Sequence, residues 1–380
     1  MRITIVIAGL GGGGAERVAV NLANAWSIRG YSPTLLTISQ NSIPPAYKVD
    51  DGVDLRDIGW PRRTREYELN AQAAAPIMRG LYANDANVLT TDLPMLAVLR
   101  FAILRAEPDV VVSFITQTNV RVLAALFESN VPVIVNEVTD ARRLYIRDWT
   151  RLREKFYRHA AHLVAPDPLI AKWFTARGVS ATSIHNPLQH PVSPIPTNST
   201  ARKRVITLSR MSSEKRVEWI VRAFAAVAER YPDWDLEIYG NGPQRNFLEH
   251  LAEDLAPPGR IRFCGFSRDA FHVLAGADIY VSASWIEGFG NSIWEALACG
   301  VPVIAIDAGP SIARLVRHEV DGLVVREHNV AGLTAALERL MKNESERKTF
   351  ASHALEVVDR FSMQAALQQW DELLSPFHTR

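Results

Sequence analysis

Short apolar runs alternate with amphipathic stretches along almost the whole chain. Runs such as ITIVIAG, DVVVSFI and VPVIAID are rich in β-branched residues, and each is followed by a stretch with the periodicity of a helix. This alternation is typical of β-α units that build a mostly parallel sheet. The predicted strands cover residues 3–9, 33–38, 53–59, 109–115, 131–137 and 162–166, and then 204–210, 236–240, 261–266, 278–284, 301–307 and 321–325.

The pattern breaks in the middle of the chain, where HNPLQHPVSPIPTNSTARKR has no hydrophobic period and is rich in Pro, Ser, Thr and Asn. Such a composition indicates an extended linker. A chain of 380 residues also exceeds one ordinary core. We therefore predict an α/β protein of two doubly wound, Rossmann-like domains, residues 1–187 and 204–360, facing each other across a cleft and joined by a linker at 188–203. The stretch from about 344 to 377 is expected to be helical, and residues 361–380 are expected to form a C-terminal helix.

Composition narrows the choice of partners and compartment. The chain has 42 Lys and Arg against 41 Asp and Glu, so its net charge gives no signature for nucleic acid. Its two cysteines, Cys264 and Cys299, fall in segments expected to be buried, which favours a reducing cytoplasm over a disulfide framework. No apolar run approaches the ~20 residues that span a bilayer, so any membrane contact is expected to be peripheral, at the inner face.

A glycine-rich loop, AGLGGGGAERV, follows the first predicted strand. Gly9, Gly11 and Gly14 fit the G-x-G-x-x-G spacing of a dinucleotide site, but the second strand ends in TISQN, without the acidic residue that holds a ribose diol. The spacing therefore gives little support to a dehydrogenase. Two interpretations stay open: the amides that start the helix predicted from Ala15 to Arg29 bind an anion such as a phosphate, or the glycines make a tight turn.

A second loop, EGFGNSIWEALACG, follows the fourth strand predicted in the second half. Ser292 and Glu295 have the spacing of a capping box, in which the glutamate needs no ligand. That interpretation leaves Glu287 unexplained. In the functional alternative the two glutamates accept hydrogen bonds from sugar hydroxyls on either side of a diphosphate. The diphosphate would then rest on the amides of Gly290, Asn291 and Ser292 at the helix start.

Cationic residues are expected near the same edge of the second sheet. The segment LSRMSSEKR follows the first strand of this half, and it places Arg210 and Lys215 on a short loop, where a guanidinium fork and a mobile ammonium suit a phosphate. A solvated basic loop is the alternative. A third loop, YGNGPQR, offers Gly240 and Gly242 for close approach to a ligand or for a simple turn.

These motifs together resemble one enzyme family. The E-x7-E pattern from Glu287 to Glu295, the pair Arg210 and Lys215, and the segments GGGAERV, GNGPQR and EALACGVPVIA resemble the retaining GT-B glycosyltransferases of family 4 over nearly the whole chain. The resemblance implies a nucleotide-diphospho-sugar donor held mainly by the C-terminal domain and an acceptor held mainly by the N-terminal domain. It also implies no cofactor and no metal, and a last helix that returns to the N-terminal domain.

The resemblance also implies a role for individual residues. Glu295 looks like the ligand of the ribose. Arg210 and Lys215 look like the catalytic clamp on the diphosphate, and Glu287 like the catalytic carboxylate near the donor sugar. The other donor contacts that the resemblance implies lie at Gly13, Gly14, Gly242, Gly265, Phe266, Gly290, Asn291 and Ser292.

On the acceptor side the sequence departs from the family pattern. Several relatives place a histidine after a glutamate at the end of a first-domain strand, whereas here Val138 follows Glu137. Glu137 is the nearest candidate for holding or activating the acceptor, with Arg142 and Arg143 as phosphate ligands. An ordinary acid at a strand end is the alternative for Glu137.

The resemblance thus implies a retaining hexosyltransferase that moves a sugar from a nucleotide-diphospho-sugar, UDP preferred over GDP, to a hydroxyl of a glycan or polyprenyl-diphosphate-linked saccharide in bacterial surface polysaccharide synthesis. A nucleotide-sugar epimerase of similar fold is the alternative, and a non-catalytic carbohydrate-binding protein would leave the cations without a purpose. A basic stretch with Arg62, Arg63 and Arg65 either contacts anionic lipids or forms an ordinary loop and helix. Asp233 and Asp235 mimic a D-x-D metal motif but open a strand, so no metal is expected there.

Overall fold

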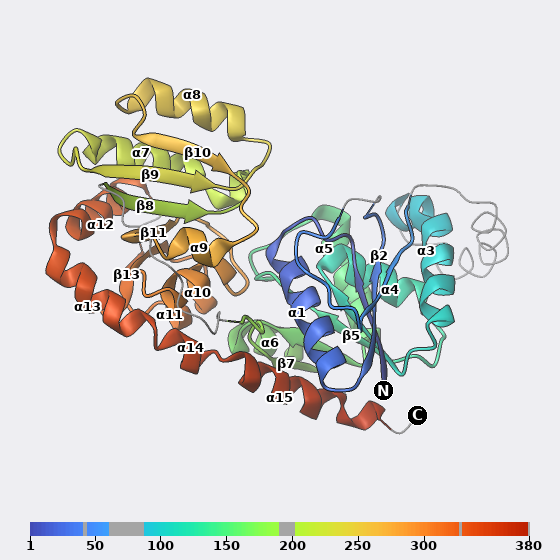
Figure 1. The fold of residues 1–380 in the computed structure, drawn as a ribbon. Helices are drawn as coiled ribbons and strands as arrows, with labels where there is room; N and C mark the ends of the chain where they lie inside the picture. Colours follow the sequence, from blue (N-terminus) through green and yellow to red (C-terminus); the bar gives the residue numbers. More distant parts are fainter. Residues whose placement is uncertain (41–43, 61–86, 190–201, 327–328, 379–380) are drawn as a thin grey trace. The chain divides into compact units, whose positions relative to one another are not determined.

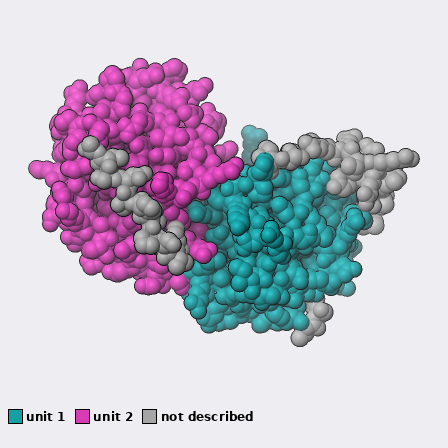
Figure 2. Space-filling view, viewed as in Figure 1, with its two compact units in different colours: residues 1–187, 363–380 teal, residues 188–362 magenta. Residues whose placement is uncertain are grey.

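The chain forms two compact units in the computed structural model. Unit 1 combines residues 1–187 with 363–380, and unit 2 comprises residues 188–362 (Figure 2). Each unit contains one parallel sheet with helices on its faces (Figure 1), so the predicted doubly wound α/β class is confirmed. The structure describes residues 1–40, 44–60, 87–189, 202–326 and 329–378.

Two expectations fall outside the described residues. One is the basic stretch with Arg62, Arg63 and Arg65, and the other is most of the predicted linker, residues 190–201.

The sheet of unit 1 has the strand order β3-β2-β1-β4-β5-β6-β7, and its neighbouring strands are parallel. Six of its strands coincide with the predicted apolar runs. The seventh, β7, was not predicted because its three residues carry no hydrophobic signal. The strands are β1 (Arg2–Ile7), β2 (Ser32–Thr37), β3 (Asp54–Asp57), β4 (Val110–Phe114), β5 (Val133–Asn136), β6 (His162–Ala165) and β7 (Ala181–Ser183).

Helices cover both faces of this sheet because its central strands are apolar on both sides. Ile5 of β1 packs in the core under α1 and α15, while its neighbour Val6 packs in the core under α3, α4, α5 and α6. The helices are α1 (Gly14–Ile28), α3 (Asn87–Arg105), α4 (Thr116–Ala125), α5 (Arg147–Phe156), α6 (Pro168–Thr175) and α15 (Met363–Leu374), with the short turn η1 (Tyr157–His159) after α5.

The sheet of unit 2 has the order β10-β9-β8-β11-β12-β13 and is also parallel. Ile304 and Ala305 of one strand pack on opposite faces, the first with α7, α8 and α12 and the second with α9, α10 and α11. Its strands are β8 (Lys203–Leu208), β9 (Trp234–Tyr239), β10 (Ile261–Gly265), β11 (Ile279–Ser282), β12 (Val303–Ile306) and β13 (Gly322–Val325), and its helices before residue 344 are η2 (Ser213–Lys215), α7 (Val217–Ala228), α8 (Arg245–Leu255), α9 (Ala270–Leu274), α10 (Asn291–Ala298), α11 (Pro310–Leu315) and α12 (Val330–Lys342).

The stretch from 344 to 377 is helical, as predicted from the sequence, and it consists of several separate helices. Phe361 packs edge-on against Phe289 of unit 2, with ring centroids 5.6 Å apart, whereas Trp370 of α15 packs edge-on against Trp26 of unit 1 at 5.5 Å. The chain therefore leaves one core and enters another, and the helix breaks between them. The elements are α13 (Glu344–Ala354), α14 (Val357–Arg360), α15 and η3 (Ser375–Phe377).

Candidate functional site

The strand order of unit 2 reverses between β8 and β11, and in open α/β sheets a ligand crevice forms where this reversal occurs. The loops that follow these two strands are linked directly. The Lys215 ammonium donates to Oε1 of Glu287 at 2.5 Å, and the backbone N–H of Trp285 donates to the carbonyl of Glu214 at 3.1 Å. Two residues that are 72 positions apart in sequence are thus brought together at this edge.

The loop after β8 gathers charge of both signs. The Glu214 carboxylate accepts a hydrogen bond from the Ser212 hydroxyl. Burial raises the pKa of Glu214, but this hydrogen bond and the nearby cations Lys215 and Arg210 outweigh burial, so its pKa lies below the usual value. Arg210 itself is exposed. The two predicted cations therefore share one loop, next to a carboxylate that stays ionised.

The start of α10 differs from the predicted capping box. The N-cap is Gly290, in a left-handed conformation with φ of 95°, and no side chain in the described part of the chain caps it. A Cβ at Gly290 would lie 3.2 Å from Leu315 and 3.3 Å from Ile312, so the position requires glycine. Ser292 lies inside the helix, where its hydroxyl accepts from Tyr280 at 2.7 Å. The capping-box interpretation of Ser292 and Glu295 is wrong.

The pKa of the Tyr280 hydroxyl is affected by both glutamates of the E-x7-E pattern. Its pKa is raised by burial first, and the hydrogen bond with Ser292 opposes this rise, while the negative charges of Glu287 and Glu295 add to it. Glu295 is buried and Glu287 is partly exposed, at 16% of its side-chain surface. The charges of both carboxylates thus affect one buried hydroxyl, which donates a hydrogen bond to Ser292 in the first turn of α10. Asn291 is the first residue of that helix.

The glycines after β9 are explained by contacts within the protein. A Cβ at Gly240 would clash with the carbonyl of Ser209, and one at Gly242 with the carbonyl of Met211. The loop after β8 and the loop after β9 are also joined by a backbone hydrogen bond, in which the Met211 N–H donates to the carbonyl of Asn241 at 3.0 Å. Of the two interpretations given for Gly242, close packing of the turn is the one that these contacts support.

Gly265 and Phe266 follow at the end of β10. Gly265 has φ of 74° and its carbonyl accepts from the N–H of Gly240 at 2.7 Å, so it lies beside the loop after β9. Phe266 exposes 44% of its surface. An aromatic ring in this position is available for stacking.

In unit 1, Gly13 is the N-cap of α1 and Gly14 is its first residue, one position before the predicted start. A Cβ at Gly13 would meet only the tip of the flexible Glu16 side chain, so the space there does not by itself require glycine. The Tyr47 hydroxyl donates to the carbonyl of Gly12 at 2.9 Å and ties the loop to a segment after β2.

Glu137 directly follows β5 and is completely buried in unit 1. Its oxygens accept from the Thr116 hydroxyl at 3.0 Å and 3.1 Å and from the Tyr157 hydroxyl at 2.8 Å. Burial raises the pKa of Glu137, and the charge of Arg153 and these hydrogen bonds oppose the rise. Glu137 is thus enclosed by the protein, and its side-chain hydrogen bonds are with Thr116 and Tyr157.

Arg142 and Arg143 gather around Asp140, which is completely buried. Arg142 binds it with two hydrogen bonds, Nε to Oδ1 at 2.9 Å and Nη2 to Oδ2 at 2.8 Å, and Arg143 lies 4.0 Å away. This pairing fixes Arg142 and gives both arginines a role within the protein.

The D-x-D mimic is neutralised by arginines. Asp235 is buried on β9 and contacts Arg202, Arg260 and Arg262 at 2.8 to 3.0 Å. Within the described ranges, no group of three or more His, Cys, Asp or Glu is arranged to hold a metal ion. Cys264, expected in a buried segment, is exposed.

Sequence reasoning missed Trp285 and Arg216. Arg216 has φ of 47°, and its guanidinium lies over the rings of Trp219 at 4.4 Å and Trp285 at 5.8 Å. These contacts brace the two loops that carry Lys215 and Glu287. Both residues lie in the segments that follow β8 and β11, next to the predicted Lys215 and Glu287, and this position could have singled them out.

Comparison with known proteins identifies the class and then the family. Residues 13–187 match the model of the glycosyl transferase 4-like domain, and residues 202–343 match that of glycosyl transferases group 1. The two models together cover most of the chain, in the order of units 1 and 2. The protein is a glycosyltransferase with the GT-B fold, and it belongs to family 4 of these enzymes. Both family models describe glycosyl transferases, so the epimerase alternative is not favoured.

Curated relatives match either the whole chain or one domain. An uncharacterized glycosyltransferase of Haemophilus influenzae is 21% identical over 95% of this chain and 96% of its own length. An exopolysaccharide phosphotransferase of Streptomyces coelicolor is 31% identical over 49% of this chain but 20% of its own length. A poly(glycerol-phosphate) alpha-glucosyltransferase of Bacillus subtilis is 28% identical over 48% of this chain and 27% of its own length. The chain thus spans only a fraction of the last two.

Solved structures share the fold over the full chain. TarM of S. aureus, in complex with fondaparinux, alpha-GlcNAc-glycerol and UDP, has a TM-score of 0.79 at 12% identity and full coverage of both chains. HepE of Anabaena, in complex with UDP-glucose, has a TM-score of 0.77 at 19% identity and covers 99% of this chain and 100% of its own. At these identities the likeness establishes the fold.

Proposed function

We propose that the protein is a retaining glycosyltransferase that takes its sugar from a nucleotide-diphospho-sugar, with UDP preferred over GDP. The observation that carries the proposal is the link between Lys215 and Glu287 across the strand-order reversal of unit 2, next to the uncapped start of α10. The fold is shared with proteins whose solved complexes contain UDP or UDP-glucose, which supports the choice of UDP.

The proposed donor site assigns the phosphates to cations and amides. The departing diphosphate gathers negative charge as the bond between the anomeric carbon and its oxygen breaks. Lys215 and Arg210 meet that charge, together with the N–H groups at the start of α10. Lys215 then exchanges Glu287 for a phosphate oxygen, and Glu287 becomes available to a hydroxyl of the sugar.

The reaction proposed is a front-face transfer. The acceptor hydroxyl forms the new bond to the anomeric carbon on the face that the diphosphate leaves, and its proton passes to the leaving phosphate oxygen. Configuration is retained without a protein nucleophile, a cofactor or a metal. Glu295 holds the ribose, and Phe266 stacks on the nucleobase at the end of β10.

The proposed acceptor is a hydroxyl of a glycan or lipid-linked saccharide in the synthesis of a bacterial surface polysaccharide. Named relatives act on related polymers, among them the poly(glycerol-phosphate) alpha-glucosyltransferase of Bacillus subtilis. In unit 1, Arg142 and Arg143 would serve such an acceptor, and Glu137 would be a positioning residue. Across the described part of the chain no helix has the length and apolar character to cross a membrane, and a peripheral contact at the inner face of the membrane remains part of the proposal.

Calorimetric titration with UDP and GDP, in the presence of EDTA, tests the donor site. We expect wild type to bind UDP more tightly than GDP, and Glu295→Gln to weaken UDP binding by about tenfold or more, because a charged acceptor of a ribose hydroxyl is lost. Glu253→Ala is the matched control, since Glu253 is highly exposed on α8. Binding of neither nucleotide, or equal affinity in both variants, would contradict the donor assignment.

Product stereochemistry tests the reaction itself. Once a screen of UDP-sugars and saccharide acceptors gives turnover, NMR of the first product should show the anomeric configuration of the donor. An inverted product would rule out the retaining proposal while leaving the donor site in place.

A further inference from the structure

Arg216 has a backbone conformation that residues with a side chain rarely adopt. Its φ of 47° and ψ of 42° are left-handed, and it lies where η2 ends and α7 begins, directly after Lys215. Glycine takes this conformation without strain, whereas another residue persists there only where its surroundings hold it. Strain of this kind next to a proposed phosphate ligand indicates that the Arg216 side chain contributes to the site.

Two tryptophan rings hold the Arg216 guanidinium. Its central carbon lies 4.4 Å from the centre of the Trp219 ring on α7 and 5.8 Å from that of the Trp285 ring in the loop after β11. A guanidinium at these distances is attracted by the face of the ring. The Arg216 Nε is buried and has no hydrogen-bond partner among the described residues, so in this part of the chain the rings fix the side chain.

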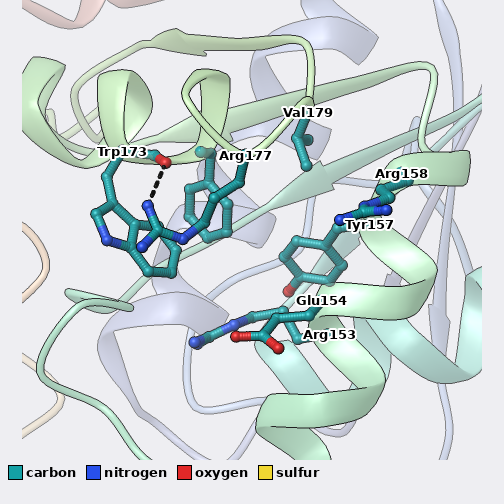
Figure 3. Close-up of a pocket in the computed structure, with 8 residues that line it drawn as sticks. Arg153, Glu154, Tyr157, Arg158, Trp173, Arg177 and Val179 are labelled. Atoms are coloured by element: carbon teal, nitrogen blue, oxygen red, sulfur yellow. Dashed lines mark hydrogen bonds between the residues drawn. The ribbon is translucent and has the colours of Figure 1, made fainter.

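Another arginine–tryptophan stack shows what is particular to Arg216. In unit 1, beside a small pocket between α5 with η1 and α6, the Arg177 guanidinium lies 3.7 Å from the centre of the Trp173 ring, and its Nη1 donates to the Trp173 carbonyl at 3.1 Å (Figure 3). These two residues are four positions apart, so their contact stabilises one helix end. Arg216 and Trp285 instead belong to the loops after β8 and β11, so their contact joins two separate segments of the proposed donor site.

The loops after β8 and β11 are also joined by contacts that do not involve Arg216. One is the ion pair between Lys215 and Glu287, and another is the hydrogen bond from the Trp285 N–H to the Glu214 carbonyl at 3.1 Å. In the proposed reaction Lys215 leaves Glu287 for a phosphate oxygen, so the ion pair opens. The hydrogen bond and the Arg216 stack include neither of these charged groups and persist through the exchange.

We propose that Arg216 is a positioning residue, which through Trp285 keeps the two loops joined while Lys215 passes from Glu287 to the diphosphate. The proposal rests on the proposed function of this site. Without the stack, the loop after β11 is free to move once the ion pair opens, and Lys215 and Glu287 no longer meet the donor in a fixed geometry. Small misplacements of this kind lower turnover more than they lower binding.

Hydrogen exchange and transfer kinetics on Arg216→Gly test the proposal. Glycine keeps the left-handed backbone and removes the guanidinium, so the variant is expected to fold. With UDP bound, we expect the peptide that contains the Trp285 amide to exchange faster than in wild type. We also expect kcat to fall about three- to tenfold, the range that one cation–π contact supports, while the affinity for UDP changes less.

A double-mutant cycle asks whether Arg216 acts through Trp285. Trp285 exposes 42% of its surface, so Trp285→Leu is expected to fold and to lower kcat by a similar factor. The double variant should lose no more than either single variant, because both remove the same contact. Losses that multiply would show that the two residues act separately and would overturn the proposal.

Arg177→Gly is the matched control, because it removes a guanidinium from a tryptophan ring in unit 1. It should change neither kcat nor the exchange of the Trp285 amide. Equal turnover and equal exchange in Arg216→Gly and this control would overturn the proposal.

A measurement without nucleotide separates this proposal from the donor assignment. Lys215→Met removes the ion pair by substitution, so the exchange of the Trp285 amide then depends on the Arg216 stack. We expect faster exchange in Lys215→Met/Arg216→Gly than in Lys215→Met alone, and equal exchange would overturn the proposal whether or not UDP binds. Faster exchange together with failure of wild type to bind UDP would support the contact between the loops and contradict the donor assignment alone.

Discussion

At the scale of single residues, the contact between Lys215 and Glu287 leads to different predictions for donor affinity and for turnover. The ammonium is already satisfied by the carboxylate in the structure. Its exchange onto the phosphate is favoured most when charge develops on the leaving group, so we expect Lys215→Met to lower kcat by about 10² to 10³ and to change donor affinity much less. Steady-state transfer kinetics check this.

Lys348→Met is the matched control for that experiment. Lys348 is highly exposed on α13 and pairs with Glu344 on the same helix. Its loss is expected to leave kcat unchanged. Equal turnover in Lys215→Met and the control would rule out the phosphate-clamp role.

Glu137 makes a second prediction at this scale, on pH dependence. Burial places its pKa in the folded state above the ordinary value of 4.5. A raised pKa means that the protonated form favours folding, so this stability is fully present below about pH 4.5 and is lost as pH rises through the folded pKa. Glu137→Gln cannot ionise. We therefore expect its stability relative to wild type to increase from pH 4.5 toward pH 8, measured by urea unfolding.

Glu154→Gln controls for a general effect of removing a carboxylate, because Glu154 is exposed close by on α5. Its stability difference from wild type should vary little over the same pH range. A constant difference for Glu137→Gln as well would show that the carboxyl titrates alike in the folded and unfolded states.

At the scale of elements, the loop before α10 depends on one backbone conformation. Gly290 has φ of 95°, and a Cβ added there would meet Leu315 at 3.2 Å and Ile312 at 3.3 Å. Gly290→Ala therefore combines left-handed strain with a tight contact, and we expect a loss of about 1 to 3 kcal/mol in the free energy of unfolding. UDP affinity should fall with it, because the helix start moves.

Gly11→Ala is the control, since a Cβ at Gly11 meets no atom within 4 Å and the residue lacks a left-handed φ. Urea unfolding and UDP calorimetry on both variants make the comparison. A stable Gly290→Ala variant with full UDP affinity would show that the helix start does not contribute to the donor site.

The same elements show what the sequence could predict. Each long apolar run became a strand, because burial on both faces of a parallel sheet demands such runs. The three-residue β7 was missed, since its pairing depends on tertiary packing. Likewise, Ser292-x-x-Glu295 matched a capping box locally, but Gly290 begins the helix because the packing against α11 accepts no side chain there.

The candidate site follows the same rule. Proximity of Lys215 to Glu287 was predictable in outline, because both follow strands on the same edge of a parallel sheet. The burial of Glu137 was not, because its partners Thr116 and Tyr157 come from other elements and only the folded chain assembles them. Local sequence patterns thus predicted which loops carry the candidate site, whereas the burial and partners of the side chains could be learned only from the folded structure.

At the scale of the whole molecule, the two units have separate cores, and the C-terminal helix belongs to the first. Trp370 of α15 is buried against Trp26 of α1, and Arg29 forms an ion pair with Asp371. The proposed donor residues other than Gly13 and Gly14 belong to unit 2. The stability of unit 1 and the nucleotide binding proposed for unit 2 are therefore expected to be separable properties, because the two units have their own cores.

Trp370→Ala tests this separation by differential scanning calorimetry. Removing a buried tryptophan costs about 3 to 5 kcal/mol, which for a unit of this size lowers the midpoint of unfolding by roughly 10 °C. We expect two unfolding transitions. Trp370→Ala should lower the midpoint of the transition of unit 1, and UDP should raise the midpoint of the transition of unit 2, since a ligand stabilises the unit that binds it. Gln369→Ala, an exposed neighbour on α15, should move neither. One common transition that both Trp370→Ala and UDP shift would show instead that the units unfold together, with the C-terminal helix stabilising the whole molecule.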